Sequence, residues 1–520
     1  MDEKRCSQPL LLQSGFHWCV NAMKENRISL SASLLTGLIC YGYAISNKLV
    51  NHDEVQCLFA KGGTVASGRW GLGALDLIFP NYSMPWVNGL LALILMAAAI
   101  CVMVRVLSIR SGTLQALFAG TVIAFPSLIG TFAYMFTTNS FALSFLLAVL
   151  AVWFVRKDKP LFLIPALGCM VLSLSIYQSY ISVAAGLLVL VLIRQLLEGE
   201  QVPTVIRRGV VSVLFLTVSL GIYYAATQVI LVLKDVSMND YAGGNVSFSL
   251  AGIPAAVVTA YASFFRFFTE GYRGLIPTTF SQLLHWVLLT LTILLLVLAV
   301  IFAKKKEPGR IALLAALIMI LPLAICCMYL FTTEDSVHTL VLYGFVCVYA
   351  LTAVAADICL DTAFRSQALQ IANGIALNLS SLVLCLILVC NLFLANEVWL
   401  NLQLRYENAF AFYTSLLSDL RTLPEFTEEM PIALIGNQQE PEFYETEFPF
   451  TSPITGTKGF KPDSYSREKF FTYYLGISLP FLSDDACGEL AANPEIGQMP
   501  CYPYFGSVRV VDDTIIVKLS

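Results

Sequence analysis

Eleven long apolar runs dominate this sequence and limit the folds that are open to it. Of its 520 residues, 57% are hydrophobic and only 13% are charged, whereas a soluble globular protein carries about 25% charged residues. A helix needs about 17–25 apolar residues to cross the hydrocarbon core of a bilayer. Runs of this kind lie near 28–46, 86–107, 113–133, 139–155, 161–176, 180–197, 208–230, 282–303, 310–331, 339–358 and 373–395. We therefore predict an α-helical membrane protein with about eleven transmembrane helices, spanning residues 28–395.

The Lys and Arg residues of the short loops predict the orientation of these spans, because positive residues collect on the cytoplasmic side. With the N-terminal segment 1–27 in the cytoplasm, every positively charged short loop falls on that side. The residues concerned are Arg105, Arg110, Arg156, Lys157, Lys159, Arg194, Arg207, Arg208, Lys304, Lys305, Lys306, Arg310 and Arg365. The short turns near 134–138, 177–179 and 332–338 contain no Lys or Arg. This asymmetry predicts a cytoplasmic N-terminus and places the outer loops 47–85 and 231–281 outside.

One further apolar segment, at 249–269, is a possible extra span. If it crossed the bilayer, Lys304 to Lys306 would lie outside and every later loop would reverse its charge bias. We therefore predict an interfacial or re-entrant helix on the outer face, broken at Pro254. An odd number of spans then leaves residues 396–520 outside the cytoplasm.

The tail at 396–520 has the composition of a small folded α/β domain. We predict an amphipathic helix at 402–423, a buried strand at 431–436, and a hairpin at 508–519 that turns through Asp512 and Asp513. Cys487 and Cys501 lie in this tail. Because an extracytoplasmic compartment is oxidising, we predict a disulfide between them. The other cysteines mostly lie within apolar runs, and none has metal-ligand spacing with a nearby His, so no metal is proposed.

The first outer loop opens with Asn51, His52, Asp53 and Glu54, directly after the first span. A carboxylate at the edge of the membrane can accept a proton from a sugar hydroxyl that attacks an anomeric carbon. Asp53 and Glu54 are therefore candidate catalytic residues. The alternative is an ordinary helix start, in which Asp at the N-cap and the following Glu satisfy free backbone N–H groups.

The same loop continues with Gly62 and Gly63 and then with the segment 67–71, in which small residues surround Arg69 and Trp70. Such a segment can approach a phosphate through backbone N–H groups and stack a sugar against the indole. The alternative is that Trp70 belongs to the interfacial aromatic belt and that Arg69 contacts lipid headgroups.

Further candidate binding residues flank this predicted outer face. Tyr177 and Gln178 lie at the end of the fifth span, where an amide can bond sugar hydroxyls or simply cap a helix. In the turn before the tenth span, Glu334, Asp335 and His338 form either an acidic patch or a polar turn.

In the long outer loop, Arg266 and Arg273 can hold a lipid phosphate in a bidentate manner. Arg266 is also spaced for an ion pair with Glu270, four residues later.

Several function classes lack their signatures. The sequence contains neither a Walker A motif nor a dinucleotide fingerprint, and no long basic block that would bind nucleic acid. Ionisable residues are almost absent from the span centres, which argues against an ion-coupled transporter. An enzyme that uses a lipid-anchored substrate fits best, without a cofactor; a translocase (flippase) or a polymerase of lipid-linked saccharides remains the alternative.

Short motifs along nearly the whole chain resemble the bacterial serotype-converting glucosyltransferases. These motifs are the acidic pair in the first outer loop, the segment Gly68-Arg69-Trp70, the pair Tyr177-Gln178, and the tail stretches 499–503 and 505–508. The resemblance implies a membrane-embedded glycosyltransferase of the C-type fold in the inner membrane of a bacterial cell.

The resemblance also implies a reaction. The donor is expected to be a polyprenyl-phosphate hexose, namely undecaprenyl-phosphate glucose, and the acceptor a surface glycan such as an O-antigen repeat. The transfer is expected to be inverting and independent of a metal. By position, Asp53 would be the general base and Glu54 a contact to the sugar or the acceptor; which carboxylate is the base stays open.

Overall fold

The structure is a computed structural model, and it describes most of the chain. The described residues are 21, 23–60, 64–79, 82–238, 252–301, 307–332, 334, 337–362, 366–438, 442–449, 451–455 and 464–520. Asp335, Gly62, Gly63, Lys304 to Lys306 and Arg365 lie outside them.

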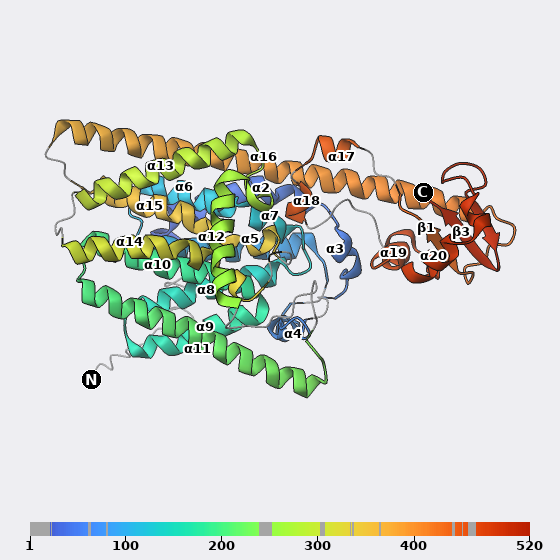
Figure 1. Cartoon of the computed structure of the whole chain (residues 1–520), viewed down its shortest axis with the longest axis horizontal. Coiled ribbons are helices and arrows are strands. Elements are labelled where there is room, and N and C mark those ends of the chain that lie inside the picture. The colour runs from blue at the N-terminus through green and yellow to red at the C-terminus, as the bar shows by residue number, and fades with distance from the viewer. Residues whose placement is uncertain are drawn as a thin grey trace, which may run out of the picture.

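Long apolar helices form a bundle (Figure 1). Among the described residues, nine helical segments are long and apolar enough to cross a membrane. They are α2 (Arg27–Ser46), α5 (Pro85–Val106), α8 (Thr138–Val155), η1 with α10 (Gln178–Glu198), α11 (Val202–Lys234), α13 (Thr279–Ile301), α14 (Pro308–Ile325), η8 with α15 (Tyr343–Leu360) and α16 (Gln367–Leu420). The predicted multi-pass architecture is confirmed. The count of eleven stays a prediction, since the fifth predicted span is the 17-residue helix α9 (Pro160–Ile176).

The predicted span at 113–133 is not one straight helix. It consists of α6 (Gly112–Ile123) and α7 (Pro126–Phe132), bent by 50° at a short break. The cause is Pro126, because a proline disfavours helical geometry in the residue before it. Phe125 accordingly takes an extended conformation, with ψ 138°.

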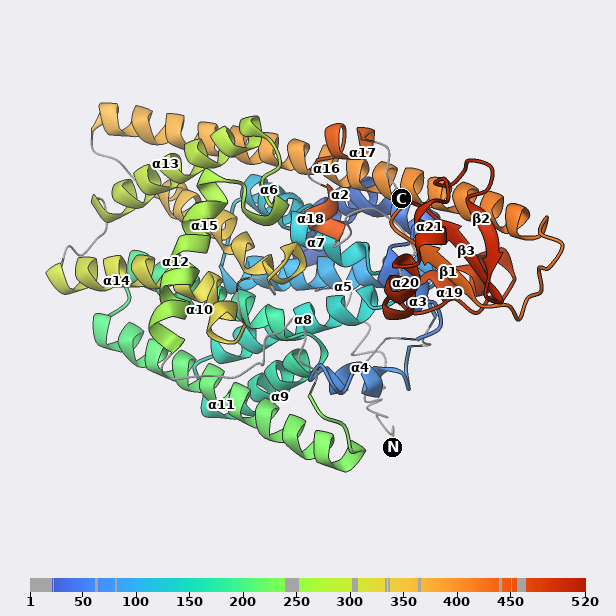
Figure 2. The same cartoon turned by 45° about the vertical axis from the view of Figure 1, so that its right-hand side comes forward.

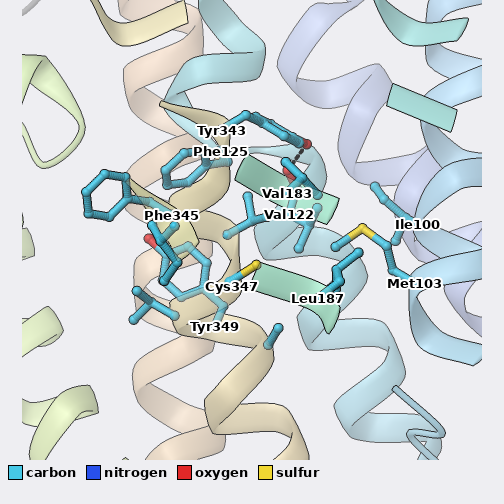
Figure 3. Close-up of a cluster of buried hydrophobic side chains, with 14 of the residues drawn as sticks. Ile100, Met103, Val122, Phe125, Val183, Leu187, Tyr343, Phe345, Cys347 and Tyr349 are labelled. Carbon is cyan, nitrogen blue, oxygen red and sulfur yellow. Dashed lines mark hydrogen bonds between the residues drawn. The ribbon is translucent and has the colours of Figure 1, made fainter. Parts of the chain in front are cut away.

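Where α6 ends, its last carbonyls have no partner within the helix. Tyr343 supplies one, since its hydroxyl donates to the Val122 carbonyl at 3.0 Å. Figure 3 shows this bond within a cluster of buried side chains that also contains Phe125 and Cys347. The cluster ties the broken helix to α10 (Ile181–Glu198) and α15 (Val346–Leu360).

Helix α12 (Ile253–Thr269) covers the extra apolar segment, and it runs steeply across the bundle helices rather than along them (Figures 1 and 2). This arrangement agrees with the prediction of a non-spanning helix. The predicted break at Pro254 is wrong. Pro254 lies in the first turn, where a helix tolerates proline because that N–H has no partner within the helix.

Helix α16 corrects the predicted boundary of the tail. The predicted span at 373–395 and the predicted helix at 402–423 are one continuous helix of 54 residues. Because no Pro or Gly follows Gly374 in this segment, nothing stops the helix. At a rise of 1.5 Å per residue it is about 80 Å long, far more than a bilayer core of about 30 Å requires. Its C-terminal half therefore projects from the bundle (Figure 1).

The projecting half of α16 carries the small α/β domain. Its sheet has the order β1-β3-β2, formed by β1 (Ile432–Ile435), β2 (Val508–Val511) and β3 (Thr514–Lys518). The predicted strand and hairpin are confirmed: β1 pairs with β3 in parallel, β2 pairs with β3 in antiparallel, and Asp512 and Asp513 form the turn with positive φ.

Cys487 and Cys501 both have free thiols, so the predicted disulfide is wrong. Cys487 is buried on α20 (Asp484–Ala491), where it packs with Ile496 and Ile516 in a small apolar core. Packing alone accounts for its burial, because a free cysteine behaves as a small hydrophobe.

Candidate active site

The candidate residues gather at the end of the bundle from which α16 projects, called the tail end below. The short helix α3 (His52–Gln56) lies there, between the bundle and the α/β domain. Asn51 caps α3 by accepting from the Glu54 N–H at 2.8 Å, and its own amide donates to the Ala133 carbonyl at 2.8 Å. Asn51, rather than Asp53, thus provides the cap that the alternative interpretation assigned to the acidic pair.

Glu54 is fully buried and engaged by the protein itself. One carboxylate oxygen lies 2.5 Å from Nζ of Lys48, and the other accepts from the Phe136 N–H at 3.2 Å. Burial raises the pKa of Glu54, while the Lys48 ammonium opposes this shift. Both oxygens are engaged within the protein, and these contacts fix α3 in place.

Asp53 differs from its neighbour because its side chain is 30% exposed. Its carboxylate lies 3.6 Å from Nε2 of His52 and does not form an ion pair with Lys or Arg among the described residues. Of the two adjacent carboxylates, only Asp53 can therefore meet an incoming hydroxyl group.

The structure brings together four of the predicted binding residues. The guanidinium of Arg69 lies over the ring of Tyr177, with its carbon Cζ 5.0 Å from the ring centroid. Gln178 donates to the Ser67 carbonyl at 3.0 Å. Trp70, at the start of α4 (Trp70–Leu75), donates its indole N–H to Oγ1 of Thr227 on α11 at 3.1 Å. The loop before α4 is thereby fixed against α9 and α11.

The protein only partly satisfies the hydrogen-bonding capacity of Arg69. Its Nε is buried without a hydrogen-bond partner, and no carboxylate pairs with its guanidinium in the described part of the chain. A buried N–H without a partner costs about 1–3 kcal/mol, which an anionic ligand would recover. The arrangement suits one oxyanion, held in the plane of the guanidinium.

Tyr223 completes this cluster, and sequence reasoning missed it. Its hydroxyl donates to the Gly68 carbonyl at 3.0 Å and accepts from the Gln178 amide at 2.9 Å. Gly68 has φ +72°, and a Cβ there would lie 2.6 Å from the Tyr223 hydroxyl. Only glycine fits this position, which brings the loop backbone close to α11.

Arg266 and Arg273 form a second cluster with Glu334. Arg266 is paired with the Glu334 carboxylate rather than with Glu270, and Arg273 donates to the Glu334 carbonyl at 3.0 Å. The Thr339 hydroxyl donates to the Arg273 carbonyl, which links η4 (Tyr272–Gly274) to η7 (Thr339–Val341). His338 immediately precedes η7, whereas Asp335 lies outside the described residues. Both arginines are thus already engaged.

The segment 133–137, between α7 and α8 (Thr138–Val155), and the first turn of α8 connect these groups. The segment binds α3 through Ala133 and Phe136, and Phe141 stacks on Tyr177 with ring centroids 4.2 Å apart. Gly130 on α7 lies close to η7, since a Cβ added at Gly130 would be 3.8 Å from the side chain of Leu340. These residues of α7, α8 and the segment between them therefore contact α3, Tyr177 of the first cluster, and η7, which is bonded to Arg273 of the second cluster.

The opposite end of the bundle is held by a different set of charges. Asp357 on α15 is buried and accepts from Nη2 of Arg194 at 2.9 Å and from the Arg110 N–H at 2.7 Å. A cavity of about 310 Å³, lined by Arg105, Arg110 and Glu25 among others, also lies at this end. It is remote from the candidate site, and its arginines are paired with carboxylates.

The described residues contain no group of three His, Cys, Asp or Glu side chains that could hold a metal ion.

Lys48, which pairs with Glu54, was not predicted as a site residue, because in the sequence it lies at the flank of the first span. Its spacing of six residues from Glu54 gives no helical signal, since the chain turns between them.

Comparison with known proteins gives one family. The model of a family described as Glucosyl transferase GtrII matches residues 42–349, which is more than half of the chain. No individual curated protein gives a significant match. The matched region contains α3, the Arg69 loop, Tyr223 and the Arg266–Glu334 cluster, and it ends before α16.

Proposed function

This chain belongs to the GtrII glucosyltransferase family, and we propose that it transfers glucose from a polyprenyl-phosphate donor to a surface glycan at the extracytoplasmic face. The observation that carries the proposal is that an accessible carboxylate, Asp53, and a guanidinium with an unsatisfied N–H, Arg69, lie at the same end of a membrane bundle. By analogy with the family resemblance, we assign the bundle to the C-type glycosyltransferase fold.

Asp53 would act as the general base. As the acceptor hydroxyl attacks the anomeric carbon, its proton passes to the Asp53 carboxylate. The new glycosidic C–O bond forms while the bond between the anomeric carbon and the phosphate oxygen breaks. Polyprenyl phosphate leaves with the bonding electrons, so the reaction needs neither an oxidant nor a nucleotide.

Arg69 would stabilise the leaving phosphate. Preorganised donors that face developing charge stabilise a transition state more than they stabilise the substrate. Of the three candidate arginines, Arg69 is chosen because Glu334 already engages Arg266 and Arg273. Trp70 and Gln178 lie beside Arg69 and would contact the donor sugar.

The positively charged loops support the orientation. Arg105, Arg156 and Arg194 lie at the end opposite to Asp53, where Arg156 donates to the Arg105 carbonyl at 2.5 Å. By the positive-inside rule, that end of the bundle faces the cytoplasm. We place the protein in the inner membrane of a bacterium. The tail end, with α3 and the α/β domain, is then extracytoplasmic.

The test is transfer of radiolabelled glucose from synthetic undecaprenyl-phosphate glucose to surface polysaccharide, in membranes that contain the wild type or Asp53→Asn. We expect transfer by the wild type and a loss of about 10²–10⁴-fold in the variant. Asp235→Asn is the matched control. Asp235 is an exposed carboxylate with φ 51° at the end of α11, a conformation that Asn tolerates well.

Transfer by neither the wild type nor the control would contradict the donor assignment. Equal transfer by the wild type and Asp53→Asn would contradict the role of Asp53. If the wild type moved intact lipid-linked saccharide across the membrane without transfer, the chain would be a translocase instead.

A further inference from the structure

Three aromatic side chains form an exposed patch beside α3, and the proposed chemistry does not use them. Phe59, Tyr82 and Tyr473 are 54%, 52% and 37% exposed, although Phe59 contacts both tyrosines. The ring centroids of Phe59 and Tyr473 are 5.1 Å apart, and those of Phe59 and Tyr82 are 5.8 Å apart. This set is called the aromatic patch below.

The patch is built by two separate parts of the chain. Phe59 and Tyr82 belong to the first outer loop, where the Ser83 N–H donates to the Leu58 carbonyl at 3.0 Å and holds the two segments together. Tyr473 belongs to η9 (Phe471–Leu475) of the α/β domain, directly after α19 (Arg467–Phe470), which packs on α3. The domain and the catalytic loop therefore present one continuous surface.

Packing alone does not explain this surface. Aromatic rings that only fastened the domain to the loop would be buried, as Phe470 and Phe471 are nearby. The three rings meet edge to face, at 86° and 88°, and each side chain still keeps more than a third of its surface exposed. Exposed apolar patches with a polar rim commonly mark binding sites.

The surroundings favour a carbohydrate. Nζ of Lys469 lies 5.8 Å from the Tyr473 ring, and His52 lies beside Tyr465 with ring centroids 6.4 Å apart. Sugar rings have apolar C–H faces that pack on aromatic rings and hydroxyl groups that bond to such polar neighbours. The most exposed aliphatic side chains of the same loop, Leu77 and Ile78, lie in another segment.

The patch is also connected to the proposed base. Phe59 lies six residues after Asp53, in the turn that follows α3, and His52 contacts both Asp53 and Tyr465. A glycan whose reacting hydroxyl lies at Asp53 would extend along this surface. We propose that the aromatic patch is an acceptor subsite, which binds sugar units of a polysaccharide beyond the one that is modified.

This inference rests on the proposed function, but its test does not require turnover. The purified full-length protein in nanodiscs is titrated with fluorescently end-labelled fragments of the bacterium's own surface polysaccharide, of one repeat and of several repeats. The variants are Phe59→Leu and Tyr473→Leu, which keep apolar volume and remove the aromatic face. Phe505→Leu is the control, because Phe505 is fully exposed in the same domain and outside the patch.

We expect the wild type and the control to bind the long fragment about tenfold more tightly than the single repeat, which corresponds to about 1.4 kcal/mol. The two patch variants should lose most of that difference, and Phe59→Trp should retain it. Equal affinity of all proteins for the long fragment would overturn the proposal and leave the rings as part of the interfacial aromatic belt. Glucose transfer to the single repeat is measured in parallel. Its absence in the wild type would contradict the proposed function, while the binding data would still decide the subsite.

Discussion

Arg69 lies over the ring of Tyr177, 5.0 Å from its centroid, with the Nε–H buried and without a partner. An aromatic ring holds a guanidinium in position without using up its N–H donors. The contact therefore orients Arg69 and leaves it able to bind an anion. The guanidinium of Arg266, by contrast, is already paired with the carboxylate of Glu334.

The first prediction concerns Arg69 itself. We expect Arg69→Ala to lower kcat/KM for glucose transfer about 10²-fold, because one oriented donor to the leaving phosphate is lost. Arg69→Lys should recover little of this, since a lysine has neither the planar fork nor the stacking face. Lys234→Ala, which removes an exposed cation at the end of α11, is the control. Full activity of Arg69→Lys would contradict the proposed contact between the plane of the guanidinium and the oxyanion.

The second prediction compares two adjacent tyrosines on α11. Tyr223 bonds to Gly68 and Gln178, whereas Tyr224 is 60% exposed. Tyr223→Phe removes the hydrogen bond to the Gly68 carbonyl and one of the two bonds of the Gln178 amide, which keeps its bond to Ser67, at a cost of about 1 kcal/mol. We expect transfer to fall about fivefold, because the loop that carries Arg69 is less well held. Tyr224→Phe should behave as the wild type in the same assay, and an equal response of both variants would argue against this role.

The third prediction concerns the pH dependence of stability. Burial raises the pKa of Glu54 above its ordinary value of 4.5. Folding therefore favours the protonated form, and this contribution to stability is present below pH 4.5 and is lost as the pH rises through the raised pKa. Glu54→Gln removes that titration. As the pH is raised from 4.5, the unfolding temperature in detergent should fall further for the wild type than for Glu54→Gln. Parallel curves for the two proteins would contradict the raised pKa of Glu54.

The sequence predicted the parts of the site that depend on chain topology. Arg69, Trp70, Tyr177 and Gln178 were placed on one face because the charge bias of the loops orients every span. The structure brings them together at the tail end. The location of Asp53 at this end follows from the same argument, since the loop that contains it comes directly after the first span; the burial of Glu54 beside it was not predicted.

The parts that depend on the rotation of a helix could not be predicted. Tyr223 lies in an apolar span where nearly every position is hydrophobic, so the sequence does not show which face meets the Arg69 loop. The bend before Pro126 was missed because the apolar run continues through it. The continuity of α16 was missed because the change from an apolar to an amphipathic pattern resembles a domain boundary, although one helix continues through it.

A fourth prediction concerns the opposite end of the bundle, where two carboxylates near Arg110 differ in burial. The Asp357 side chain is 2% exposed and bonds to Arg194, itself 3% exposed, whereas Asp361 is 57% exposed and lies 2.6 Å from Nη2 of Arg110. Asp357→Asn leaves the buried Arg194 with only the half-exposed Glu198 as a carboxylate partner, at 2.8 Å, and we expect a cost of about 3 kcal/mol. Asp361→Asn breaks a solvated pair, which costs about 0–1 kcal/mol.

We therefore expect Asp357→Asn to unfold at a clearly lower temperature than the wild type in detergent, and Asp361→Asn to unfold close to it. The glucose transfer of the protein that remains folded should be unchanged in both variants, because the site lies at the other end of the bundle. Equal unfolding temperatures of the two variants would show that the Arg194–Asp357 pair contributes no more than a surface pair. A loss of transfer by folded Asp357→Asn would instead show that the two ends of the bundle are coupled through α10 and α15, the helices that the pair joins.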